Sequence, residues 1–145
     1  MRLSAVFAVA LALASAPIRG MAEENDQEVE AHKVALDLAA AFSNEGFKIR
    51  DGHWAGSLKP QDRALIAVNL YAGNQYWFSI GATEKAKKIG VGVFDESGRK
   101  VATEDYDDGE KVAAGFSPAT SGQYFVAVDL REGEESTCCL VYSYK

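Results

Sequence analysis

The sequence predicts a mainly β protein: an antiparallel sandwich of about seven or eight short strands, preceded by one amphipathic helix. From Phe47 onward, short alternating apolar segments are separated by turn residues, at the roughly 8–12-residue spacing typical of sandwiches. Segment 27–44 instead places its apolar residues at steps of three and four, the period of a helix. The segment 75–80 (QYWFSI) is also echoed by 123–128 (QYFVAV), each after a glycine turn.

The first 22 residues have the pattern of a secretory signal peptide. Arg2 supplies a positive charge, residues 3–14 are apolar, and small residues follow. The apolar run is shorter than the roughly 20 residues that a membrane span needs. We favour cleavage after Ala22 over the alternative after Ala16, which Pro17 would follow. The expected product is an exported, periplasmic or extracellular protein without a membrane span, in which residues 23–145 form a single domain.

The net charge of the chain limits the classes of molecule that it is expected to bind. The formal charge of −6 becomes −8 when Arg2 and Arg19 are removed with the signal peptide, and no basic cluster is left. Nucleic acids and anionic lipids are therefore poor partners, because both are bound through clustered cations. We expect an unknown envelope protein or a glycan as the partner, and a monomer or weak oligomer.

Within the predicted domain, the helix has Asp26 as its N-cap and Gly46 near its end. Its apolar stripe is expected to pack on the sandwich, which occupies residues 47–145. The central element is Ile66–Ile80, where two alternating strands flank the turn at residues 72–74, the pattern of a half-buried hairpin. Gly90 and Gly92 lie on one face of a later strand and suggest a bend there, or the close approach of another element.

Three segments resemble a known family. GNQYWF at 73–78, VGVFDESG at 91–98 and FSPATSGQY at 116–124 are similar to the strand and turn segments of bacterial pre-peptidase C-terminal domains. The resemblance covers roughly Leu65–Tyr144. It implies a jelly-roll-like β-sandwich of a secreted protein, in a family whose members usually follow an enzyme.

Aromatic residues are the first candidates for ligand binding. Trp77 and Phe125 occupy matching places in the two echoed strands, and Trp54 follows a turn at Asp51–Gly52. Aromatic rings exposed on one sheet are suited to stacking against sugars. We favour the alternative that the second sheet covers one face and the helix the other, because the apolar stripe of the helix must pack somewhere.

The acidic segment Glu104–Glu110 is the candidate metal site. Asp105, Asp107 and Asp108, with Asp95, offer the carboxylate oxygens that Ca²⁺ prefers. The segment does not fit the 12-residue loop of an EF-hand. If Gly109 takes the glycine position, which is the sixth, the ligand positions three and twelve fall on Tyr106 and Gly115, which have no carboxylate. We favour a solvated turn at Asp108–Gly109, and we expect no cofactor other than this possible Ca²⁺.

The chain has few residues for catalysis. Its two histidines, His32 and His53, are interpreted as surface residues, and the sequence has no Gly-x-Ser-x-Gly elbow for a nucleophile. Cys138 and Cys139 point to opposite faces of the last strand. We expect Cys138 to be buried and Cys139 to be the exposed, reactive thiol, which could link two chains in an oxidising compartment.

These observations favour a non-catalytic secreted or periplasmic sandwich with a binding or accessory role in the cell envelope, and not an enzyme. The alternative is a carbohydrate- or calcium-dependent ligand-binding module. Burial of Trp77 would argue against sugar binding at that residue.

Overall fold

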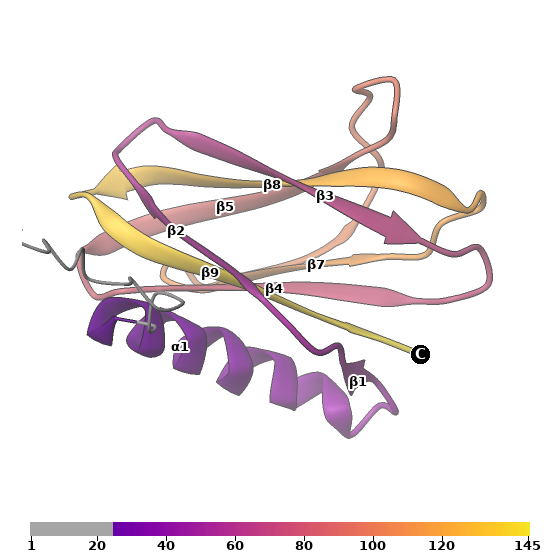
Figure 1. The fold of residues 1–145 in the computed structure, drawn as a ribbon, viewed down its shortest axis with the longest axis horizontal. Coiled ribbons are helices and arrows are strands. Elements are labelled where there is room, and N and C mark those ends of the chain that lie inside the picture. The colour runs from indigo at the N-terminus through magenta and orange to yellow at the C-terminus, as the bar shows by residue number, and fades with distance from the viewer. Residues whose placement is uncertain (1–24) are drawn as a thin grey trace, which may run out of the picture.

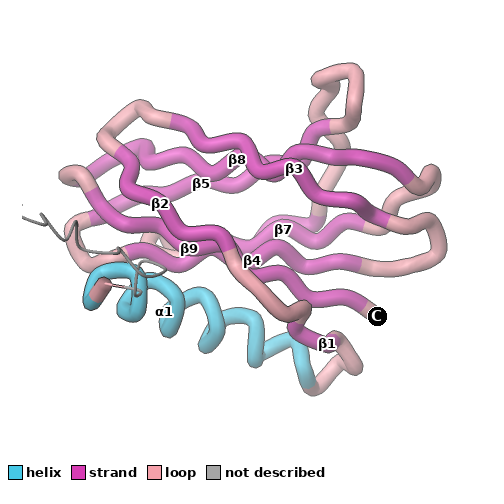
Figure 2. The backbone as a smooth tube through the Cα atoms, viewed as in Figure 1, coloured by secondary structure: helices cyan, strands magenta, loops and turns pink. Residues whose placement is uncertain are grey.

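The structure is a computed structural model that describes residues 25–145. The predicted signal peptide, 1–22, lies outside the described residues. Within the described part the chain forms one helix and nine strands, arranged as two facing antiparallel sheets with the helix below one of them (Figures 1 and 2). The mainly β sandwich predicted from the alternating segments is thus confirmed. The elements are α1 (Asp26–Ser43), β1 (Lys48–Ile49), β2 (Trp54–Leu58), β3 (Arg63–Leu70), β4 (Tyr76–Ala82), β5 (Ala86–Phe94), β6 (Glu104–Asp107), β7 (Val112–Phe116), β8 (Gly122–Gly133) and β9 (Ser136–Tyr144).

The larger sheet has six strands in the order β1-β9-β4-β7-β6, with β2 also pairing with β9. The smaller sheet has the order β3-β8-β5. The main core lies between the sheets, where Phe78 and Ile80 of β4 and Val126 and Val128 of β8 have no exposed surface. Tyr76 and Tyr124, the matching residues of the echoed strands, are both buried in this core from opposite sheets.

The helix packs on β4 and β9, as its apolar stripe predicted. Ala31, Ala35 and Ala39 form a second buried cluster with Cys139 and Val141 of β9. The N-cap is Asn25 and not Asp26, because the Asn25 side chain accepts a hydrogen bond from the Glu28 N–H at 2.8 Å. None of the helical segments among residues 25–145 has the length and apolarity to cross a membrane.

The predicted hairpin at Ile66–Ile80 is wrong in its pairing. Both strands exist, but β3 pairs with β8 while β4 pairs with β7 and β9. The connection at residues 71–75 therefore carries the chain from one sheet to the other. The period-two pattern reports which face of a strand is buried, and two strands that face one core from opposite sheets have the same pattern as a hairpin.

The segment Glu104–Glu110, predicted as a loop, begins with a strand. Residues Glu104–Asp107 form β6, which pairs with β7 at the edge of the larger sheet and is exposed along its whole length. Charged, exposed residues are typical of an edge strand, since they discourage pairing with another chain.

Candidate functional site

The structure does not bring the three aromatic candidates together. Trp77 of β4 faces the helix and stacks on Phe42, with ring centroids 4.2 Å apart and planes 9° apart. Phe125 lies on β8 of the other sheet, and Trp54 is half-buried on β2. The helix covers Trp77, as the favoured interpretation expected, and Trp77 and Phe125 belong to different sheets, so they do not form one aromatic face.

The four acidic candidates each bond within their own turn. Asp95 accepts hydrogen bonds from the Ser97 hydroxyl at 2.6 Å and from the Arg99 N–H at 3.0 Å, and these bonds lower the pKa of Asp95. Asp107 accepts from the Gly109 N–H at 2.7 Å. The other two behave alike: Asp105 accepts from the Thr103 hydroxyl, and Asp108 from the Glu110 and Lys111 N–H groups.

No metal centre is formed by these carboxylates. Across residues 25–145 no group of three or more His, Cys, Asp or Glu side chains is placed to hold a metal ion. Carboxylates that cap turns explain the acidic spacing of this segment without a ligand.

The two cysteines lie on opposite faces of β9, but both have no exposed surface. Cys138 belongs to the core between the sheets, and burial raises its pKa to about 11. Cys139 packs under the helix with Ala31 and Ala35. The expected exposure of Cys139 is therefore wrong, because the helix covers the outer face of this strand.

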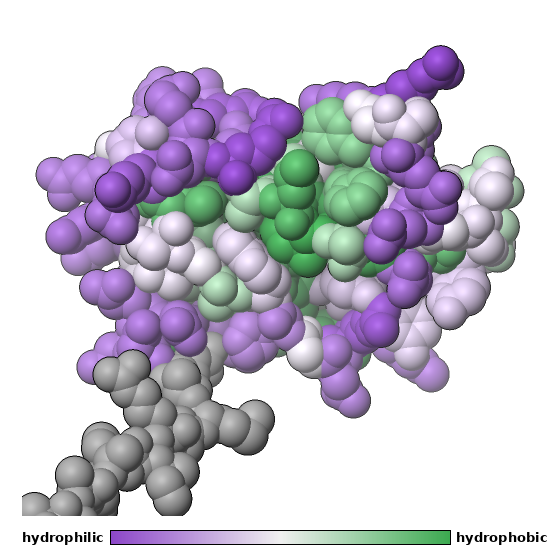
Figure 3. Space-filling model, turned by 45° about the horizontal axis from the view of Figure 1, so that its top comes forward, coloured by the Kyte–Doolittle hydropathy of each residue, from purple (hydrophilic) through white to green (hydrophobic). Residues whose placement is uncertain are grey.

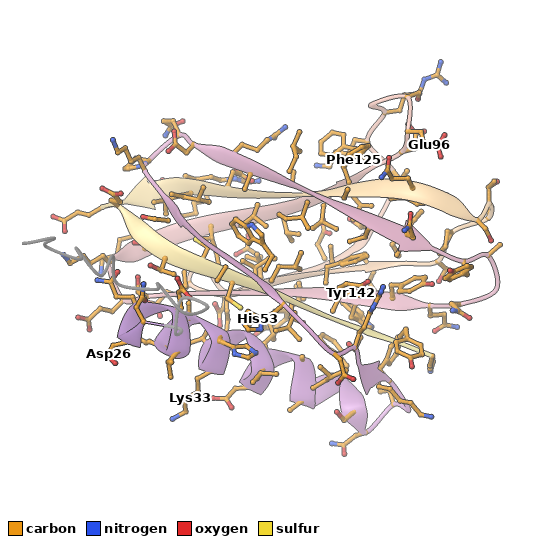
Figure 4. All side chains as sticks on the ribbon, in the orientation of Figure 1. Asp26, Lys33, His53, Glu96, Phe125 and Tyr142 are labelled. Carbon is orange, nitrogen blue, oxygen red and sulfur yellow. The ribbon has the colours of Figure 1, made fainter. Side chains whose placement is uncertain are left out.

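The two histidines, which sequence reasoning treated separately, stack on each other. The rings of His32 on α1 and His53 before β2 have centroids 3.8 Å apart and planes 25° apart. Figure 4 shows His53 beside the helix. This contact joins the helix to the chain that enters β2, and no sequence spacing indicated it.

The outer face of the smaller sheet has no helix over it. Here Arg63 and Leu65 of β3, Phe94 of β5 and Phe125 of β8 surround a shallow hollow of about 340 Å³, and we call these four residues the sheet-face patch. Leu65 is 62% exposed, and the Arg63 guanidinium carbon lies 5.5 Å from the Phe94 ring centroid. Figure 3, which brings this side of the molecule forward, shows apolar surface in the middle with hydrophilic residues around it.

A second hollow opens at the end of the sandwich where the β3–β4 connection and the end of β9 meet. Its volume is about 280 Å³, and sequence reasoning missed it because its lining comes from separate segments. The lining consists of four tyrosines, two asparagines and one arginine: Tyr71, Tyr76, Tyr142, Tyr144, Asn69, Asn74 and Arg50. We call this hollow the tyrosine pocket.

The fold and these surfaces define a helix-backed antiparallel β-sandwich with one uncovered sheet face. No family model matches the chain, and a search of curated proteins found no match. Six solved chains match in structure. One is PliG of Aeromonas hydrophila, a periplasmic inhibitor of g-type lysozyme, with a TM-score of 0.51 and 17% sequence identity over 70% of this chain and 90% of that chain.

At this level of identity the match shows a common fold. It also corrects the predicted membership of the pre-peptidase C-terminal family, which no family model supports. The three segments that carried that resemblance are mostly strand ends and turns: Gly73 and Gly98 have φ of 92° and 82° in turns. Turns of this kind recur in unrelated sandwiches, so they do not identify a family.

Proposed function

We propose that this chain is an exported, non-catalytic protein of the cell envelope that binds a g-type lysozyme and blocks its activity. The observation that carries the proposal is the structural likeness to PliG, which extends over 90% of that protein. The predicted signal peptide supports it independently, because export is required to reach the periplasm, the compartment named for PliG. The periplasm is accordingly the proposed location.

The sheet-face patch is the surface that we assign to the lysozyme. It combines an exposed leucine and two half-buried phenylalanines with an arginine held over one of the phenylalanine rings. Aromatic residues and arginine are the residue types that contribute most to binding energy at protein interfaces. An apolar surface bordered by charged residues is also typical of an interaction site. Phe125, predicted from sequence to bind a ligand, is retained here as a contact residue (Figure 4).

The net charge of the chain also indicates the charge expected of its partner. The formal net charge of −8 expected for the exported form, −6 for the whole chain, favours a cationic partner, because opposite charges raise the rate of encounter. Association with the lysozyme should therefore slow as the salt concentration rises, while the dissociation rate changes less.

The test is inhibition of a g-type lysozyme in a turbidity assay on bacterial cell walls. The exported form of the chain should abolish lysis at a near-stoichiometric ratio, and the heat-unfolded chain should not. Unchanged lysis at a tenfold excess of folded chain would refute the proposal. Inhibition of only a different lysozyme class would refute the assigned partner and keep the inhibitory role.

Matched variants test the surface. Leu65→Glu places a charge within the patch, at a position that is 62% exposed. The control, Val29→Glu, places the same charge outside the patch, on the helix, at a position that is 51% exposed. Leu65→Glu should weaken inhibition by about tenfold or more, the effect of losing an interface contact worth over ~1.4 kcal/mol. Val29→Glu should leave it unchanged. Equal inhibition by both variants would show that the lysozyme binds elsewhere.

A further inference from the structure

The tyrosine pocket has a rigid polar floor. Tyr76 is 4% exposed, and its hydroxyl accepts hydrogen bonds from the Tyr71 N–H at 2.9 Å and from the Asn74 side-chain amide at 3.2 Å. These bonds fix the β3–β4 connection against the start of β4. The side chains of Tyr76 and Asn74 are therefore positioned before any ligand arrives, which lowers the entropy cost of binding.

One wall of the pocket is formed by a cation and a phenol. Arg50 donates a hydrogen bond to the Tyr142 hydroxyl, and its guanidinium carbon lies 5.1 Å from the Tyr142 ring centroid. Burial raises the pKa of Tyr142 although Arg50 opposes the shift, so the phenol stays neutral at physiological pH. A guanidinium has five N–H donors, and the contact with Tyr142 leaves others to face the pocket. Figure 4 shows Tyr142 between the two sheets near this end of the sandwich.

The rim supplies exposed aromatic surface. Tyr71 is 62% exposed and Tyr144 is 38% exposed, and both rings border the pocket. A tyrosine ring offers an apolar face to the CH groups of a ligand and a hydroxyl to its polar groups. Asn69 and Asn74 add amide donors and acceptors.

The charged and polar groups that line the tyrosine pocket indicate which classes of ligand it can bind. Of the described residues that line the pocket, none carries a carboxylate, although the chain as a whole is acidic. A polyphosphate would call for several cations, and only Arg50 is present in the lining. A purely apolar ligand would remove Arg50 and the amides from water without giving them a partner, which is unfavourable.

We propose that the tyrosine pocket binds a sugar residue that carries a carboxylate. The guanidinium of Arg50 pairs with the carboxylate, for which its planar fork is suited. The rings of Tyr71 and Tyr144 contact the apolar face of the sugar, and the asparagines bond to its hydroxyl or acetamido groups. A hollow of about 280 Å³ is at the lower limit of small-molecule sites and suits a short or terminal sugar. This inference does not depend on lysozyme binding.

The test is an NMR titration of the folded, exported chain with two pairs of sugars. N-acetylmuramic acid differs from N-acetylglucosamine by a lactyl ether group that carries a carboxylate, and glucuronic acid has a carboxylate at C6 in place of the hydroxymethyl group of glucose. Saturable shifts at the pocket should appear with at least one acidic sugar, at an affinity about tenfold or more above that for its neutral counterpart. The acidic sugar that binds identifies the type of glycan. Equal binding within both pairs, or no binding of either acid, would overturn the proposal.

Variants locate the site. Arg50→Gln should remove the preference for the acidic sugar, and Tyr71→Ala should weaken the binding of acidic and neutral sugars alike. Tyr106→Ala is the matched control, because Tyr106 is a 43% exposed tyrosine on β6 outside the pocket. Thermal unfolding checks that each variant is folded. A preference for the acidic sugar that survives in folded Arg50→Gln would also overturn the proposal. The titration contains no lysozyme, so its result is separate from that of the inhibition assay.

Discussion

At Gly81 of β4 the larger sheet lies directly against the helix backbone. A Cβ atom at this position would lie 2.6 Å from the Ala31 carbonyl oxygen and closer still to the Ala35 amide nitrogen. Both contacts are to helix backbone, which cannot rotate away as a side chain can. Gly81→Ala must therefore shift the helix or bend β4. Overfilling a packed site of this kind costs about 1–3 kcal/mol of unfolding free energy.

Urea denaturation measures this loss of unfolding free energy for Gly81→Ala, with Gly92→Ala as the control variant. Gly92 is also a strand glycine, but a Cβ there would meet the Lys100 Cε at 3.5 Å, an ordinary contact. We expect the Gly92 variant to stay within about 0.5 kcal/mol of the wild type. Tryptophan fluorescence gives a second signal, since Trp77 stacks on Phe42 of the helix. If Gly81→Ala were as stable as Gly92→Ala, the close seating of the helix would be refuted.

Four further predictions concern the helix, the two thiols, the pH dependence of stability and the N-terminus. Leu38 is 7% exposed on the helix, so Leu38→Ala should lower the unfolding free energy by about 2–5 kcal/mol, and an unchanged urea midpoint would contradict this. Cys138 and Cys139 are both buried, so intact-mass analysis should show alkylation only after unfolding, and rapid modification of one thiol in the folded chain would contradict it. Because the pKa of Cys138 is raised from 9.0 to about 11, the folded state keeps a proton that the unfolded chain loses above pH ~9. The unfolding free energy should therefore fall as the pH rises from about 9 to about 11. Over that range the urea midpoint of Cys138→Ala should fall less than that of the wild type, because the variant lacks this thiol. Mass spectrometry of the exported chain should find Glu23 first, and a mass that retains residues 3–14 would contradict cleavage.

The fold class could be predicted because burial imposes a period on each element. The helix stripe and the alternating strands both report a buried side, and the structure contains both. The pairing of β3 with β8 could not be predicted in this way, because the alternation of Ile66, Val68 and Leu70 is the same whichever strand lies beside them. Sheet membership depends on contacts distant in sequence, which a local pattern does not contain.

The candidate sites were harder to predict for a related reason. Cys139 was expected to be exposed because a strand has two faces, but the helix turns its outer face into a second interior. The tyrosine pocket combines Arg50 with residues near positions 70 and 143, and only the folded chain brings these together. Phe125 was singled out by its place in a repeated strand, and the structure leaves its face without a helix.

Three strand glycines make room for different groups on the two sheets. On the larger sheet, Gly81 makes room for helix backbone, and α1 covers the sheet. On the smaller sheet, Gly90 lies under the Arg131 guanidinium, whose Nη2 would be 2.5 Å from an added Cβ, and Gly92 lies under the Lys100 side chain. The close approach predicted from these glycines is therefore made by flexible charged side chains. Such side chains can move aside at low cost, whereas a helix cannot. The outer face that carries Leu65 and Phe125 is therefore the sheet face from which no helix would have to move for the lysozyme that we propose as the partner.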